Sequence, residues 1–131
     1  KKYELSVGTN FSYNRNTTTF NTEPIEFMDN NLSVSGTIYY KKVWSLQTEY
    51  NYDWRQKTDQ FSESLNINIW NARIQRTFAK DAFTAYVLVR DILNQNIGIS
   101  RNAYSNTLSE TRNDRLRRYF MVGFAWNFKN K

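Results

Sequence analysis

The side chains with the clearest potential for catalysis in this chain are carboxylates, namely Glu49, Asp53, Glu63, Asp81 and Asp91. Two of them side by side would be enough for general acid–base chemistry. The chain has no histidine and no cysteine, however, so the commonest general base, the commonest metal ligand and every thiolate site are missing. It also has no glycine-rich phosphate loop and no nucleophile elbow. We therefore expect no enzyme, no metal and no cofactor, and carboxylates that line a polar surface.

A second group with recognisable chemistry is a cluster of arginines near the C-terminus, in a chain whose net charge is +6. Its members are Arg101, Arg112, Arg115, Arg117 and Arg118. Guanidinium groups bind phosphate through paired hydrogen bonds. A solvated loop is the simpler interpretation of the cluster, and contact with a phosphate-bearing partner is the alternative.

The elements that carry these residues show alternation of apolar and polar side chains. From Trp44 to Trp54, for example, the even positions are mostly large and apolar and the odd positions are polar. Period-two alternation is typical of a strand with one face in an apolar medium, and no segment has the 3.6-residue period of a helix. The sequence therefore predicts an all-β protein. Its six expected strands are Tyr3–Tyr13, Leu32–Tyr40, Trp44–Trp54, Leu65–Phe78, Ala82–Leu93 and Phe120–Phe128.

The lengths of these strands favour a membrane over water as the apolar medium. The clean ones run to about 9–13 residues, which suits a tilted transmembrane strand, whereas strands of soluble proteins average about 5–6. Aromatic residues make up 17% of the chain although its mean hydropathy is −0.75. Aromatic and polar residues must therefore be separated by position along the chain. The longest apolar run, Ala85–Val89, is far too short for a membrane helix. We expect a transmembrane antiparallel β-barrel.

The connections between the strands provide an independent test. Two are short, Lys41-Lys42 and Ala79-Lys80-Asp81, and three are long and polar, Asn14–Asn31, Arg55–Gln60 and Asn94–Asp114, in strict alternation. Outer-membrane barrels have short periplasmic turns and long extracellular loops. If the last strand runs toward the periplasm, both short turns lie there. The arginine cluster then lies outside, where its partner would be lipopolysaccharide.

The strongest alternation belongs to the last strand, with Phe120, Val122, Phe124, Trp126 and Phe128 on one side. Such an aromatic C-terminal strand resembles the signal read by the barrel assembly machinery, with strand addition as the recognition mode. It departs from the usual signal because three polar residues follow the final phenylalanine. The alternative is a lipid-facing strand without a recognition role.

Large aromatic residues near the strand ends are expected to form belts at the two membrane interfaces. The predicted members are Trp44, Tyr52, Trp54, Trp70 and Tyr119, together with Trp126 of the last strand. An ordinary soluble core is the alternative. The apolar phase also changes between Ile69 and Asn71, which predicts a β-bulge there.

Six strands are too few to close a membrane barrel, since the smallest have eight. An open sheet would leave two unpaired edges in hydrocarbon. Residues 1–131 are therefore expected to be the last six strands of a larger barrel, incomplete on its own, whose other strands come from the same protein or another chain. The first residues lack the apolar core of a signal peptide, so we expect that such a signal has been removed or that the chain is a piece of a longer one.

A resemblance to a known family rests on two motifs. The first is D-I-L-N-Q-N-I-G-I-S-R from Asp91, and the second is E-T-R-N-D-R-L-R-R-Y-F-M, which ends at Met121. Together with I-W-N-A-R-I before them, they resemble the C-terminal end of Bacteroidetes-type outer-membrane β-barrel proteins related to TonB-dependent receptors. The resemblance is sharpest over residues 65–128. It implies a barrel of twenty-odd strands, with a plug domain and TonB box that are not present in these residues.

Three functions follow as alternatives. The resemblance implies binding and uptake of a solute across the outer membrane of a Gram-negative bacterium, with TonB acting through the plug. A structural barrel subunit of an envelope complex is the first alternative. A soluble β-protein that binds nucleic acid through basic and aromatic residues is the second; the membrane interpretation expects no nucleic-acid partner.

Overall fold

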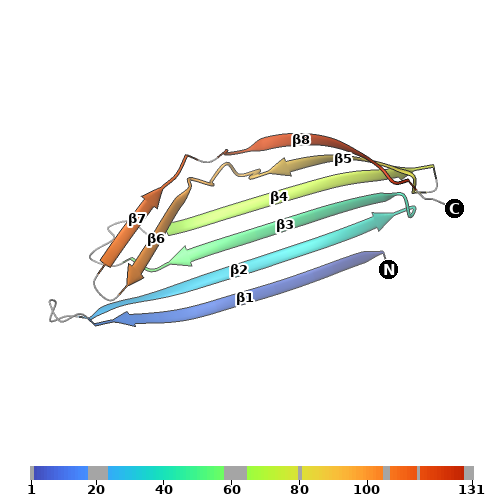
Figure 1. Ribbon diagram of the computed structural model, residues 1–131. Helices are drawn as coiled ribbons and strands as arrows, with labels where there is room; N and C mark the ends of the chain where they lie inside the picture. Colours follow the sequence, from blue (N-terminus) through green and yellow to red (C-terminus); the bar gives the residue numbers. More distant parts are fainter. Residues whose placement is uncertain are drawn as a thin grey trace.

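The computed structural model describes residues 2–17, 24–57, 65–79, 81–104, 107–114 and 116–128. These residues form eight strands and no helix (Figure 1). The strands are β1 (Tyr3–Asn16), β2 (Ile25–Tyr40), β3 (Trp44–Arg55), β4 (Leu65–Phe78), β5 (Phe83–Arg90), β6 (Ile99–Tyr104), β7 (Thr107–Arg112) and β8 (Tyr119–Trp126). Among these residues we find no helix capable of crossing a membrane.

Six of the strands form one antiparallel sheet in the order β1-β2-β3-β4-β5-β8. Each strand pairs with its predecessor in the sheet, so the sheet is a simple meander with β1 and β8 as its edges. Figure 1 shows these edges on opposite sides of the sheet, which is therefore open. The predicted all-β antiparallel architecture with six strands in the main sheet is confirmed.

The register of the five pairings gives the sheet two chemically different faces. We call one the apolar face, and it includes Leu5, Val7, Phe11, Val34, Ile38, Trp44, Leu46, Tyr50, Trp54, Trp70, Ile74, Val87, Phe120, Val122, Phe124 and Trp126. We call the other the polar face, and it includes Ser12, Asp29, Asn31, Gln47, Glu49, Asn51, Asp53, Arg55, Asn71, Arg73, Tyr86 and Arg90. Each residue lies on the same face as its cross-strand partner. The alternation within single strands therefore produces two continuous surfaces.

Large side chains of the apolar face are exposed to a degree that is unusual for a protein in water. Val122 is 82% exposed and Leu5 is 72% exposed, at opposite edges of the sheet. Soluble monomers rarely expose an apolar patch larger than about 300–600 Å².

Trp44 and Trp54 lie near the two ends of β3. Ten residues at about 3.4 Å each, tilted by roughly 40°, span about 25 Å, the height of the apolar band of an outer-membrane barrel.

The two tight turns lie at the same end of the sheet, as the sequence predicts. Lys41 and Lys42 both have positive φ, 51° and 57°, between the paired residues of β2 and β3. Ala79 and Asp81 also have positive φ, 50° and 72°, between β4 and β5. A tight hairpin turn uses this region because its twist then matches that of the strands. The loop ends differ from the prediction, because β1 and β2 continue their pairing as far as Asn16 and Ile25.

The predicted β-bulge near Ile69–Asn71 is wrong. The register between β3 and β4 is unbroken from Trp44↔Arg76 to Arg55↔Leu65. Ile67 and Ile69 lie on the polar face, whereas Trp70 begins the apolar stripe on the other face. The strand therefore carries two apolar stripes on opposite faces, and a change of phase in the sequence does not require an inserted residue.

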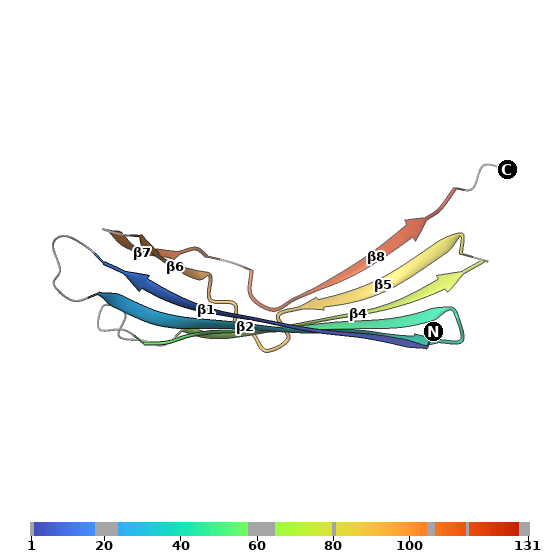
Figure 2. The same cartoon turned by 90° about the horizontal axis from the view of Figure 1, so that it is seen from below.

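The last loop, predicted as a polar connection, contains a second sheet formed by β6 and β7. Figures 1 and 2 show this hairpin over the loop end of the main sheet, on the side toward which β8 bends. On β2, Phe27 of the polar face is only 7% exposed, whereas Met28 of the apolar face is 40% exposed. The Arg55 guanidinium of β3 lies 5.2 Å from the centre of the Phe27 ring and contributes to its burial.

Candidate functional site on the polar face

The motif that begins with Asp91 forms a buried turn between β5 and the last loop. Asp91 is 2% exposed and has a φ of 50°. Its carboxylate accepts hydrogen bonds from the backbone N–H groups of Gln95 (3.0 Å) and Asn96 (2.9 Å). Its own N–H donates to Oδ1 of Asn71 (3.0 Å), and Oδ1 of Asn94 accepts the N–H of Arg118 (3.2 Å). The turn therefore fixes both the start of the loop and its return to β8.

Toward the loop end, the polar face is held by a network around Asp29. Its carboxylate accepts hydrogen bonds from Ser12 (3.3 Å) and Asn14 (2.8 Å) of β1, and it forms an ion pair with Arg55 of β3. The Arg55 guanidinium also lies 5.2 Å from the centre of the Phe27 ring. These groups are satisfied by one another, so this part of the face serves to hold three strands together.

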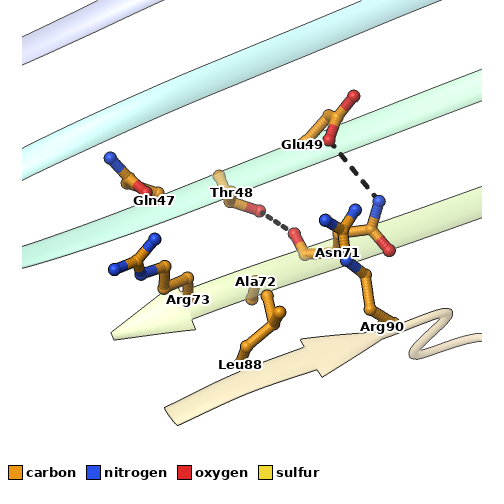
Figure 3. Close-up of a pocket in the computed structure, with 8 residues that line it drawn as sticks. All are labelled: Gln47, Thr48, Glu49, Asn71, Ala72, Arg73, Leu88 and Arg90. Atoms are coloured by element: carbon orange, nitrogen blue, oxygen red, sulfur yellow. Dashed lines mark hydrogen bonds between the residues drawn. The ribbon is translucent and has the colours of Figure 1, made fainter. Parts of the chain in front are cut away.

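In the middle of the sheet, the same face contains a hollow of about 180 Å³. Figure 3 shows its lining residues, which are Gln47, Thr48, Glu49, Asn71, Ala72, Arg73, Leu88 and Arg90. Glu49 accepts a hydrogen bond from the Asn71 amide at 3.5 Å. The two arginines come from β4 and β5, and together with one carboxylate they give the hollow a net positive charge.

Arg73 is held in place by a stack that crosses three strands. Its guanidinium lies 4.2 Å from the centre of the Tyr86 ring of β5. That ring in turn lies over Gly123 of β8, where an added Cβ would overlap Tyr86 Cζ. Tyr86 thus occupies the space that a side chain at position 123 would need, and it orients Arg73 through a cation–π contact.

The structure separates the carboxylates that the sequence singled out. Glu49 lines the hollow, Asp53 accepts a hydrogen bond from Asn31, Asp81 lies in a tight turn and Asp91 in the buried turn. Glu63 is outside the described residues. Within the described ranges, no group of three or more acidic, histidine or cysteine side chains is arranged to hold a metal ion.

The proposed assembly residues lie on one face of the edge strand β8 or just beyond it. Phe120, Val122, Phe124 and Trp126 belong to the apolar face. Phe83 stacks on Phe124 and Trp126 with ring centres 5.6 and 5.4 Å away, and Phe128 lies 4.2 Å from Trp126. This placement is compatible with the predicted recognition role, which stays a prediction.

Five of the six residues predicted for the aromatic belts share the apolar face, Trp126 among them. Trp44 lies at the turn end, with the Arg76 guanidinium 5.1 Å from its ring, and Trp54 lies at the loop end. Tyr52 is paired with Leu32, and Trp70 with Tyr50, well inside the sheet. Tyr119 differs from the prediction, because its pairing with Arg90 puts it on the polar face. The belts themselves stay a prediction.

The arginines of the last loop are spread over several segments. Arg101 lies in β6, Arg112 ends β7, and Arg117 and Arg118 precede β8. Arg112 forms an ion pair with Glu110 at 2.7 Å. Arg115 is outside the described residues. Contact with lipopolysaccharide stays a prediction.

Sequence reasoning missed the two arginines that line the hollow, Arg73 and Arg90, and the pair Tyr86 and Gly123 that positions Arg73. The sequence offered one weak signal, a glycine inside an otherwise large and apolar last strand. A strand glycine often marks a close approach by another group. Which group approaches it depends on the register between β5 and β8.

An open antiparallel sheet with one lipid-compatible face and one polar face defines a wall segment of a transmembrane β-barrel. Residues 1–126 match the outer membrane protein beta-barrel family, and the chain belongs to this family. This membership favours the barrel prediction over a soluble β-protein. No curated protein and no solved structure matches the chain.

Proposed function

We propose that the six strands are part of the wall of a larger, TonB-dependent-receptor-like barrel in the outer membrane of a Gram-negative bacterium, which binds a solute and takes it up. The observation that carries this proposal is the polar face, with its arginine-lined hollow at mid-sheet and a loop hairpin over its outer end. This surface offers a polar solute charged and hydrogen-bonding groups on the inside of the barrel. The role is binding and transport without catalysis.

The unpaired edges of β1 and β8 support a larger barrel. Each backbone group without a partner in hydrocarbon costs several kcal/mol, so both edges need further strands. We propose that these strands come from the same parent protein, and that the barrel assembly machinery inserts them. TonB would act through a plug, and lipopolysaccharide would surround the loop end.

Depletion of solutes from the growth medium tests the proposal for a substrate of any chemical class. Mass spectrometry compares the medium of the wild type, of a strain lacking this protein and of a strain lacking TonB. We expect at least one solute that only the wild type depletes. Equal depletion by the wild type and the strain without this protein would refute uptake. Dependence on this protein but not on TonB would indicate a passive channel.

A structural wall subunit of an envelope complex is the second candidate, favoured by the same two open edges, which another chain is also able to pair. Chemical crosslinking in whole cells separates the two. Crosslinks from cysteines placed at Asn10 and at Ala125 are expected within one polypeptide for a receptor. Crosslinks to a different polypeptide would favour the subunit.

A further inference from the structure

The hollow on the polar face holds two arginines, Arg73 and Arg90, that form no ion pair with any acidic residue in the described part of the chain. Glu49, the carboxylate in the lining, instead accepts the side-chain amides of Asn51 (3.0 Å) and Asn71 (3.5 Å). Among the described lining residues, the two arginines therefore outnumber the single carboxylate of Glu49.

Arg73 is also poised for a ligand. Its Nε is buried and has no hydrogen-bond partner in the described part of the chain. A buried donor of a charged group is rarely left unsatisfied unless an ion or ligand completes it. The Tyr86 ring, 4.2 Å from the guanidinium, limits the directions in which Arg73 can turn. In Figure 3 both guanidinium groups extend from their strands toward β3, on either side of the hollow.

We propose that this hollow binds an oxyanion, the carboxylate or phosphate group of a solute, between Arg73 and Arg90. Guanidinium groups match the geometry of such groups through paired hydrogen bonds, and the amides of Gln47 and Asn71 add neutral donors at the rim. The site rests on the proposed function and deepens it, because it assigns an acidic solute to the barrel. The site lies beside the turn at which the last loop begins, because Asn71 of its lining accepts a hydrogen bond from the Asp91 N–H.

Nuclear magnetic resonance of the whole barrel protein in detergent micelles at low salt tests the site. The probes are inorganic phosphate, followed by ³¹P line broadening, and acetate labelled at the carboxylate, followed by ¹³C line broadening. We expect the R73Q/R90Q double variant to weaken binding of at least one probe by tenfold or more. The matched control is R76Q, which removes the same charge from the same strand but on the apolar face, beside Trp44 and Phe78. It is expected to bind like the wild type.

The two probes separate the possible sources of the oxyanion. Binding of phosphate alone assigns a phosphorylated solute, and binding of acetate alone assigns a carboxylate. No broadening with the wild-type protein, or equal weakening by R76Q, overturns the proposal. If the double variant fails to assemble, Tyr86→Leu takes its place, since it frees Arg73 without removing charge and is expected to weaken binding.

The outcome is independent of the uptake experiment. If R73Q/R90Q loses binding but the wild type depletes no solute, transport is refuted and the binding site stands. Solute depletion that persists in R73Q/R90Q without any loss of affinity overturns the site alone.

Discussion

The apolar and polar faces are built from alternate residues of the same strands, yet they depend on sequence in different ways. On the apolar face, neighbours such as Val122 and Val87 meet as cross-strand partners and need only be apolar and of suitable size. On the polar face, Asp29 has three specific partners and Arg73 depends on Tyr86, which depends on Gly123. The apolar face therefore tolerates exchange among apolar residues of similar size. The network of specific contacts on the polar face does not tolerate such exchange.

Of the substitutions that test this difference between the faces, a charge on the apolar face is expected to reduce stability most. Val122→Arg puts a guanidinium in the middle of β8, where contact with lipid is expected to cost about 2–4 kcal/mol of the barrel's free energy of unfolding. The matched variant is Met121→Arg, one residue away on the polar face, with an expected cost below about 1 kcal/mol. Urea unfolding in lipid vesicles measures both. Equal costs would contradict the assignment of the faces.

Adding a methyl group at one glycine on each face compares how tightly the two faces are packed. Gly123→Ala on the polar face forces Tyr86 aside and is expected to cost about 1–3 kcal/mol. Gly36→Ala on the apolar face meets only ordinary contacts, the nearest being the Glu4 carbonyl oxygen at 3.6 Å, and is expected to change stability by less than about 0.5 kcal/mol. The same unfolding experiment applies. A larger loss for Gly36→Ala would show that packing is tighter on the apolar face.

At the end of the last strand, the expected effect concerns assembly more than stability. Phe128→Ala removes a ring that contacts Trp126 but is itself largely exposed, so it is expected to cost less than about 1 kcal/mol. Its effect is expected in the rate of assembly, which heat-dependent gel mobility follows over time. Phe11→Ala, on the apolar face of β1, is the control. Equal rates for the two variants would remove the recognition role from the last strand.

Much of the main sheet was predictable because its signals are local. Alternation in Trp44–Trp54 shows which side chains share a face, and Lys41-Lys42 leaves room only for a tight turn. Asp91 was singled out by a motif, but its role in capturing the amides of Gln95 and Asn96 required the folded turn.

The errors have a common physical cause, since each concerned the position of one segment relative to another. The phase change at Ile69 suggested a bulge because the sequence does not show that Ile67 and Ile69 lie on the polar face of an unbroken strand. The β6–β7 hairpin is short and polar, so its strands lack the alternation that marked the others. Tyr119 was proposed for an aromatic belt from its type and its place near a strand end, whereas its register with Arg90 puts it on the polar face.

The sequence by itself determined that the chain forms long antiparallel strands with one apolar side, because period-two alternation is a property of each strand alone. Only the tertiary structure decided that Arg73 and Arg90 line one hollow and that Tyr86, packed over Gly123, contacts Arg73 there. These residues come from three strands, and a shift of one residue in any pairing would send their side chains to the opposite face. Register between strands is fixed by turns and packing across the whole sheet, and no single segment contains that information.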